Sequence, residues 1–136
     1  MLPPSALPGC QILIVDDDAG VRDVCSTLLR ALGYRAAEAS SGHKALETLV
    51  RDGVNNDALS DDRVQLVLLD LEMPGMHGGE VLRAMKEANP QVRVLVMSGK
   101  PGRDLHTFLA DGADGVLRKP FGMQALDASV MAALRH

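Results

Sequence analysis

The feature that most constrains the fold is an alternation, repeated five times, between a short apolar run and a longer segment with helical spacing. Residues 12–15 form the first such run, and apolar residues then recur at helical spacing between Val21 and Leu32, before Gly33. Unbroken apolar strands need a sheet covered on both faces, and strands that alternate with helices imply parallel pairing through right-handed crossovers. The sequence therefore predicts a doubly wound α/β domain with a five-stranded parallel sheet and five helices.

The bounds of these elements follow from where each pattern starts and stops. The predicted strands lie at residues 11–15, 34–39, 64–69, 92–97 and 116–117, and the predicted helices at 21–32, 42–50, 79–88, 105–110 and 123–134. Residues 1–10 contain three prolines and no period, so we expect a linker or disordered tail before a folded domain at 11–136. Residues 51–63 are polar and predict a mobile surface loop, in which Asp57, Asp61 and Asp62 are solvated rather than bound to metal.

Composition excludes several classes of function. A chain of 136 residues is one domain, and 14 basic against 18 acidic residues give a net charge of −4, which provides no general basic field for direct nucleic-acid binding. No apolar stretch approaches the ~20 residues that span a bilayer, so we expect no membrane insertion and a cytoplasmic protein. The two cysteines, Cys10 in the tail and Cys25 in a helical pattern, predict no disulfide and fit a reducing compartment.

Polar residues follow four of the predicted strands. Asp16 and Asp17 follow the first, Asp70 the third, Ser98 the fourth, and Lys119 comes shortly after the fifth. Ligands of such sheets bind beyond the carboxyl ends of the strands, so these side chains are expected to meet there. Crowded carboxylates repel one another, and a hard cation such as Mg²⁺ resolves the repulsion while reaching phosphate oxygens.

The same residue set predicts a phosphoryl-transfer chemistry. Lys119 would supply a positive charge to one phosphate oxygen and Ser98 a hydroxyl donor to another. Asp70 is the carboxylate placed to attack phosphorus, and phosphoryl transfer needs positioning and charge neutralisation more than covalent help. We therefore expect formation and loss of an aspartyl phosphate at Asp70.

The motifs that carry these residues resemble those of the receiver domain of bacterial two-component response regulators. They are Ile12-Leu13-Ile14-Val15-Asp16-Asp17-Asp18, Val67-Leu68-Leu69-Asp70-Leu71-Glu72-Met73-Pro74-Gly75-Met76-His77-Gly78, Val94-Leu95-Val96-Met97-Ser98-Gly99 and Leu117-Arg118-Lys119-Pro120-Phe121. The resemblance extends from Gln11 to the C-terminus. It implies a flavodoxin-like fold with strand order 2-1-3-4-5.

The resemblance also implies what the acidic residues do. Asp70 would accept a phosphoryl group from a phosphohistidine of a histidine kinase or a histidine phosphotransfer domain. Mg²⁺ would be held by Asp17, Asp70 and the backbone carbonyl of Glu72, with Asp16 acting mainly through a metal-bound water. The domain would catalyse its own phosphorylation and slow dephosphorylation without being a turnover enzyme.

Further residues take their roles from the same resemblance. Ser98, Gly99 and Lys119 would bind the phosphoryl group, with the glycine leaving its approach open, and the Lys119-Pro120 bond would be cis. The switched surface for a downstream protein partner would comprise the helix at 105–110, the fifth strand and the last helix.

Three features depart from the family pattern. Val116 stands where many members carry an aromatic ring that moves inward on activation, His77 replaces a frequent acidic residue, and the segment at 51–63 is longer than usual. We therefore expect activation to pass through Ser98 and the helix at 105–110. Glu72 and Lys100, opposite in charge, are expected to flank the entrance for hydrolytic water as a weak ion pair.

Two other interpretations have to be tested. A small haloacid-dehalogenase-like phosphatase would use Asp16 as nucleophile and Asp18 as acid, with Ser98 and Lys119 in support, but it leaves the motif around Asp70 without a task. An interaction module without chemistry would not label in the presence of Mg²⁺. The chain is either a stand-alone receiver or part of a larger protein such as a hybrid histidine kinase, and the proline-rich start favours the second.

Overall fold

The predicted sheet is present. The protein is described by a computed structural model that covers residues 10–55, 63–75 and 77–135, and its five parallel strands have the order β2-β1-β3-β4-β5. The strands are β1 (Gln11–Val15), β2 (Arg35–Ala39), β3 (Val64–Asp70), β4 (Arg93–Ser98) and β5 (Gly115–Arg118). This confirms the α/β class and the strand order 2-1-3-4-5 expected from the sequence.

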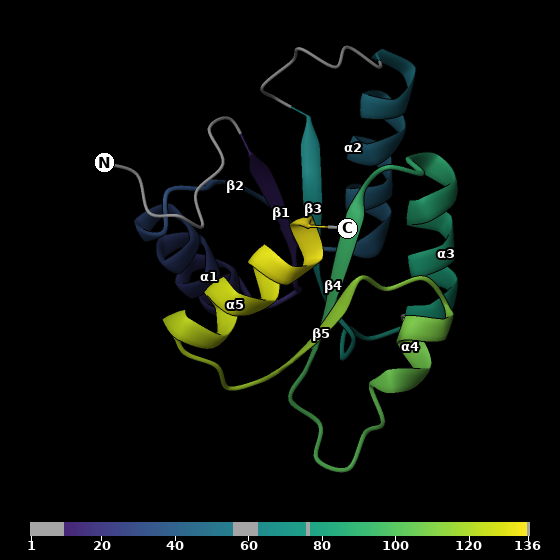
Figure 1. Ribbon diagram of the computed structural model, residues 1–136. Coiled ribbons are helices and arrows are strands. Elements are labelled where there is room, and N and C mark those ends of the chain that lie inside the picture. The colour runs from purple at the N-terminus through teal and green to yellow at the C-terminus, as the bar shows by residue number, and fades with distance from the viewer. Residues whose placement is uncertain (1–9, 56–62, 76, 136) are drawn as a thin grey trace.

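Helices cover both faces of the sheet, as its apolar strands require. Figure 1 shows α1 (Ala19–Ala31) and α5 (Met123–Leu134) on one side, and α2 (Gly42–Asn55), α3 (Gly78–Ala88) and α4 (His106–Ala110) on the other. The alternation of side chains along each strand separates two cores. Ile12 and Ile14 of β1 pack in the core under α1 and α5, while Leu13 and Val15 pack in the core under α2, α3 and α4.

The start of α1 lies directly beyond β1 because Asp18 caps the helix. Its carboxylate accepts hydrogen bonds from the backbone N–H groups of Gly20 at 2.8 Å and Val21 at 3.3 Å, which satisfies two donors that the first helical turn leaves free. Gly33, with a φ of 98°, then turns the chain toward β2 after α1 ends. The short connection from β1 to α1 keeps Asp16 and Asp17 at the carboxyl edge of the sheet.

The predicted loop at 51–63 is wrong in its first part. α2 continues through Arg51 to Asn55, and the Asp52 carboxylate accepts a 2.8 Å hydrogen bond from the backbone N–H of Val64, the first residue of β3. This bond joins the last turn of α2 to the sheet, a tertiary contact that helical periodicity does not reveal. The predictions for Asp57, Asp61 and Asp62 fall on residues 56–62, outside the described residues.

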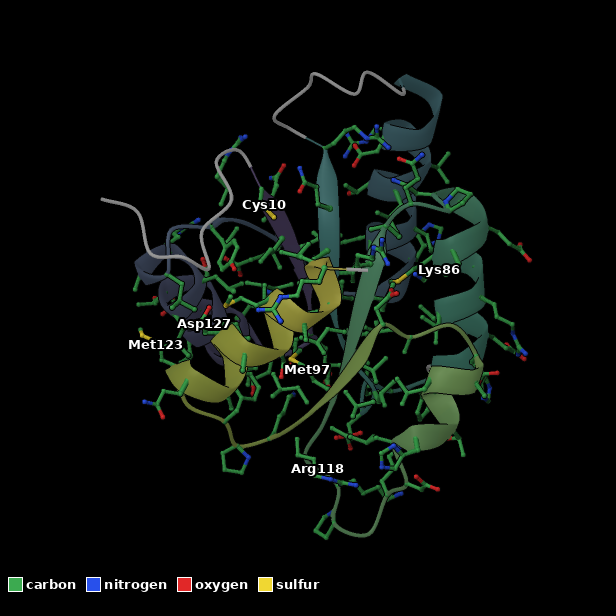
Figure 2. All side chains as sticks on the ribbon, viewed as in Figure 1. Cys10, Lys86, Met97, Arg118, Met123 and Asp127 are labelled. Carbon is green, nitrogen blue, oxygen red and sulfur yellow. The ribbon has the colours of Figure 1, made fainter. Side chains whose placement is uncertain are left out.

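Cys10 belongs to the fold rather than to the tail in which the sequence placed it. It is buried among the side chains under α1 and α5, and its carbonyl accepts a 3.0 Å hydrogen bond from the backbone N–H of Arg35. Figure 2 labels it at the start of β1. Cys10 and Cys25 are both free thiols, and burial raises the pKa of each to about 11, so both are protonated and unreactive at neutral pH.

The remaining predicted bounds shift by only one or two residues. Residues 1–9 lie outside the part of the chain that the structure describes. Within the described ranges, none of the helices combines the length and the apolar character needed to cross a bilayer.

Candidate functional site

Three carboxylates meet at the carboxyl edge of the sheet. Oxygens of Asp16 and Asp17, which follow β1, and of Asp70, the last residue of β3, all lie within 4.8 Å of one another. Asp16 and Asp70 are buried, whereas Asp17 is exposed. The neighbouring pairing of β1 with β3 brings these positions together, as the sequence predicted.

Lys119 follows the edge strand β5 and reaches this cluster with its side chain. Its Nζ lies 2.9 Å from Oδ2 of Asp16 and 3.1 Å from Oδ1 of Asp70, so one ammonium bridges the two buried carboxylates. The Lys119-Pro120 bond is cis, as expected, and the backbone N–H of Lys119 donates to the carbonyl of Ser98 at 2.8 Å. The chain beyond β5 therefore brings a fixed positive charge to the acidic edge.

Burial and charge oppose each other at Asp70. Burial raises the pKa of this carboxyl above its usual 3.8, and the hydrogen bonds from Lys119 and from the backbone of Glu72 lower it only in part. At Lys119 burial is the largest single influence and lowers the pKa, but the hydrogen bonds to Asp16 and Asp70, with their negative charges, together raise it above 10.5. Lys119 is a cation at neutral pH, and Asp70 is an acid whose charge is incompletely compensated.

This donor set fits a hard divalent cation. The three candidate ligands are all carboxylate oxygens, and the exposed side of the cluster at Asp17 leaves room for water ligands. A cation there would relieve the residual negative charge around Asp70. The acidic cluster is thus a site that could hold Mg²⁺.

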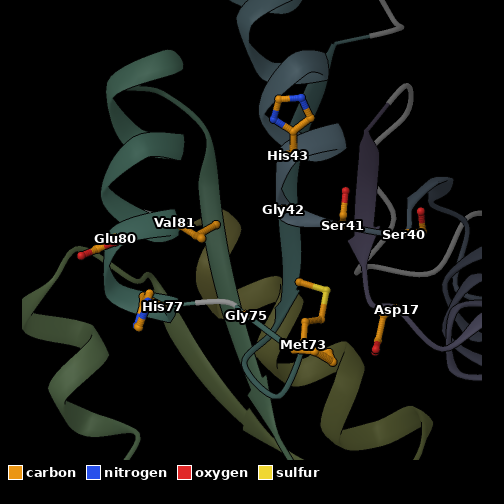
Figure 3. Close-up of a pocket in the computed structure, with 11 residues that line it drawn as sticks. Asp17, Ser40, Ser41, Gly42, His43, Met73, Gly75, His77, Glu80 and Val81 are labelled. Carbon is orange, nitrogen blue, oxygen red and sulfur yellow. The ribbon is translucent and has the colours of Figure 1, made fainter.

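A cavity of about 340 Å³ lies beside Asp17 and is bordered by the starts of α2 and α3. Figure 3 shows the residues that line it. His77, which replaces a frequent acidic residue, lies on its wall at the N-cap of α3 and makes no side-chain capping hydrogen bond. His43 also lines the cavity, but its Nε2 lies 3.0 Å from the Glu47 carboxylate one turn along α2. Neither histidine belongs to the carboxylate cluster.

Ser98 and Gly99, at the end of β4, face an unexpected neighbour. The hydroxyl of Ser98 donates to one carboxylate oxygen of Glu72 at 2.9 Å, and the backbone N–H of Gly99 donates to the other at 2.6 Å. The guanidinium of Arg103 lies 3.0 Å from the same carboxylate. The Glu72 side chain is thus placed at the phosphate-binding positions predicted for Ser98 and Gly99.

The partner predicted for Glu72 was wrong. Its ion pair in the structure is with Arg103, while Lys100 contributes a backbone N–H to the Ser98 hydroxyl at 3.2 Å. Both basic residues lie in the irregular segment between β4 and α4, where residue spacing does not fix the direction of a side chain. The only available signal was that two bases follow Ser98 within five residues.

The geometry speaks against the phosphatase interpretation. Asp18, which would be its general acid, is occupied as the cap of α1, and Asp16, its nucleophile, is held by Lys119 and by the backbone N–H of Asp18 at 3.0 Å. Asp70, which that interpretation leaves without a task, is the residue that Lys119 and Asp16 surround.

Comparison with known sequences identifies the family. The family model described as the response regulator receiver domain matches residues 12–131. The alkaline phosphatase synthesis transcriptional regulatory protein SphR of Synechococcus elongatus is 33% identical over 137 aligned residues, which cover 100% of this chain and 53% of that protein. The DNA-binding response regulator MtrA of Mycobacterium tuberculosis is 36% identical over 127 residues, covering 93% of this chain and 51% of that protein. The chain therefore spans about half the length of these curated relatives.

Solved structures agree with this assignment. A response regulator receiver domain protein from Clostridium thermocellum has a TM-score of 0.77 at 26% identity, covering 93% of this chain and 94% of that one. The chemotaxis protein CheY4 of Vibrio cholerae has a TM-score of 0.76 at 25% identity, covering 92% and 98%. These matches overturn the interpretation as a haloacid-dehalogenase-like phosphatase. The chain belongs to the response regulator receiver domains of two-component signalling systems.

Proposed function

We propose that Asp70 accepts a phosphoryl group from a phosphohistidine of a histidine kinase or a histidine phosphotransfer domain, and that this switches the contacts of the domain with a downstream partner. The observation that carries the proposal is the convergence of Asp16, Asp17 and Asp70 within 4.8 Å, with Lys119 on Asp70 at 3.1 Å. A buried carboxylate beside a fixed cation, open to solvent on its Asp17 side, is suited to attack an incoming phosphorus atom.

The transfer is a single exchange of bonds. An oxygen of Asp70 forms a bond to phosphorus as the phosphorus–nitrogen bond of the donor breaks, and the departing imidazole takes up a proton. Lys119 compensates charge on the transferred oxygens, and the buried position of Asp70 keeps the nucleophile in place. In the later loss of phosphate, a water oxygen would form the bond to phosphorus as the bond to the Asp70 oxygen breaks, which releases inorganic phosphate and restores the carboxylate.

Asp17, Asp70 and the backbone carbonyl of Glu72 would hold Mg²⁺, with Asp16 acting through a bound water. The metal would supply neutralising charge for the phosphoryl oxygens. The backbone N–H of Glu72 donates to Oδ1 of Asp70 at 3.2 Å, which holds this stretch of chain against the acidic cluster. The residues present therefore agree in type and in proximity with such a role.

Ser98, Gly99 and Lys119 would bind the phosphoryl group. Two observations support this role: Lys119 lies 3.1 Å from Asp70, and Ser98 ends β4, the strand that pairs with β3. A Cβ added at Gly99 would lie 3.4 Å from Cβ of Lys119, so a side chain there would press on the stem of the lysine that serves Asp70.

The larger protein around the domain is part of the same proposal. Residues 10–136 would form the receiver, because Cys10 packs in its core, and residues 1–9 would form a linker, with α4, β5 and α5 as the surface presented to the output partner. The domain would modify itself rather than turn over a substrate.

Labelling with a small phosphodonor tests the proposal. Acetyl phosphate with Mg²⁺ should add a phosphoryl group to the protein, measured by intact mass spectrometry, whereas EDTA or the substitution Asp70→Asn should abolish it. Asp23→Asn, which removes an exposed aspartate on α1, is the matched control and should label normally. Equal labelling in EDTA would contradict the proposal, and absence of labelling in the parent would favour an interaction module without chemistry.

A further inference from the structure

The carboxylate of Glu72 occupies two hydrogen-bond donors at the end of β4. One oxygen accepts from the Ser98 hydroxyl at 2.9 Å, and the other accepts from the Gly99 backbone N–H at 2.6 Å. These bonds cross 26 and 27 positions of sequence and join the β3–α3 loop to β4. A negatively charged group with two oxygens is therefore already bound where a phosphoryl group on Asp70 would need the same donors.

Arg103 holds the Glu72 carboxylate in this position. Its guanidinium lies 3.0 Å from the Glu72 carboxylate and stacks over the Phe108 ring of α4, 5.4 Å from the ring centre. The carbonyl of Arg103 accepts a 2.7 Å hydrogen bond from the guanidinium of Arg118, the last residue of β5, which Figure 2 labels beside the loop after β4. The anion on Ser98 is thus connected, through one arginine, to α4 and to β5.

The two donors cannot serve Glu72 and a phosphoryl group at once. A serine hydroxyl has one hydrogen to donate and a backbone amide has one, and both are given to the Glu72 carboxylate. The Glu72 side chain is 31% exposed, so it can leave toward solvent. Its backbone is held separately, by the N–H bond to Asp70, so the side chain can move while the main chain stays.

We propose that Glu72 is a positioning residue that acts as a built-in anionic latch: it holds Ser98 and Gly99 in the resting state, and phosphorylation must displace it. This inference rests on the proposed phosphorylation of Asp70. It adds the energetic cost of breaking the hydrogen bonds of Glu72 to Ser98 and Gly99. Displacing Glu72 also removes the charge partner of Arg103. The latch thereby links the arrival of phosphate to the loop before α4 and to the end of β5.

Kinetics of labelling test the latch. Glu72→Ala should accept phosphate from acetyl phosphate about three- to tenfold faster than the parent, since the hydrogen bonds that compete with the incoming group are gone. Glu72→Gln should show a smaller gain, because its amide oxygen still accepts a hydrogen bond but does not hold Arg103. Glu80→Gln, which removes an exposed carboxylate on the cavity beside Asp17, is the matched control for general charge and should change the rate by less than about twofold.

Two further measurements separate a latch from a loss of local structure. In nitrogen-15 NMR spectra the Gly99 amide proton should move upfield in Glu72→Ala, because its short bond to a carboxylate is lost, and should stay in place in Glu80→Gln. Arg103→Gln should speed labelling in the parent but add nothing in the Glu72→Ala background, since both substitutions open the same contact.

The outcomes distinguish this inference from the function on which it rests. Absence of labelling in the parent would overturn both. Labelling of the parent at Asp70, with Glu72→Ala no faster than the parent, would overturn the latch alone. An additive effect of Arg103→Gln in the Glu72→Ala background, or an unchanged Gly99 amide shift, would also overturn it.

Discussion

The surroundings of Asp70 disfavour the charged form of its carboxyl group. It is 3% exposed and lies beside two other carboxylates, and within the described part of the chain the ammonium of Lys119 is the one cation that contacts it. Folding moves the Asp70 carboxylate out of water and close to other negative charges, which costs free energy. The raised pKa of Asp70 reflects this cost. Such a cost is typical of a site that is completed by a further positive charge.

The substitution Asp70→Asn should stabilise the metal-free protein. Because the folded-state pKa is raised, the contribution of Asp70 to stability is fully present below pH 3.8 and is lost as pH rises through the folded pKa. At pH 7 in EDTA we expect the melting temperature to rise by about 3–5 °C, which corresponds to ~1 kcal/mol for a domain of this size.

Thermal unfolding followed by circular dichroism at several pH values measures this effect. The advantage of Asp70→Asn should shrink as pH falls through the raised pKa of Asp70, because Asp70 then becomes neutral in the parent as well. Asp23→Asn should show no such gain. A melting temperature of Asp70→Asn below that of the parent at pH 7 would contradict the account.

Removal of the cation should have the opposite effect. Lys119→Met leaves the buried carboxylates of Asp16 and Asp70 without their bridge, so we expect a loss of about 2 kcal/mol at pH 7, less than the ~3–5 kcal/mol typical of a fully buried pair. The loss should diminish at lower pH, as the Asp70 carboxyl, whose pKa burial raises, takes up a proton. Urea unfolding measures it, and Lys100→Met, at an exposed lysine, should stay within ~0.5 kcal/mol of the parent. An equal loss at pH 5 and pH 8 would count against the bridge.

The positions of several residues around Asp70 could be predicted from the sequence for a simple physical reason. Asp16, Asp70 and Ser98 are fixed by strands, and strands are visible as apolar runs. The contact between Glu72 and Arg103 was not visible, because both residues lie in connections whose path depends on the packing of the rest of the molecule.

At the scale of elements, one of the three departures from the family pattern, Val116, lies in the segment from β4 to β5. Val116 of β5 is half-buried against the core under α4, so no ring is available there to move inward. α4 has only five residues and is held to the sheet by Phe108 and Leu105. A short helix with few buried contacts is the element that a change at Ser98 can shift most easily.

Beryllofluoride, which mimics a phosphoryl group on a carboxylate, should reveal this route. With Mg²⁺ present, we expect large NMR shift changes at Ser98, in the loop at 99–105 and in α4, and modest ones at Val116. The shift map of the amides measures it, and residues of α2, remote from β4 and β5, provide the internal reference. Changes at Val116 as large as those in α4 would contradict this route.

The length of α2 shows why element bounds are harder to predict than elements. Gly53 and Asn55 are poor helix formers, so sequence alone ends the helix near Val50. The helix continues because Asp52 gains a partner in the first residue of β3. A contact made only in the folded molecule outweighs the local preference of the chain.

At the scale of the whole molecule, the fold separates stability from chemistry. Two apolar cores hold the strands beneath the helices that cover each face of the sheet (Figure 1). The polar side chains of the site gather at the carboxyl edge of the sheet. The parallel sheet could be predicted from the strand–helix alternation, and that topology alone brings four distant motifs to the same edge. The stability that the two cores provide can therefore offset the energetic cost of the uncompensated negative charge around Asp70.

Locating the phosphoryl group on the chain decides whether Asp70 is the phosphoacceptor. After labelling with acetyl phosphate and Mg²⁺, reduction with borohydride converts a phosphoaspartate into homoserine, and peptide mass spectrometry then locates the modified residue. The account predicts conversion at Asp70 and none at Asp16, Asp17 or the exposed Asp23. Conversion at Asp16 with Asp70 unchanged would contradict it.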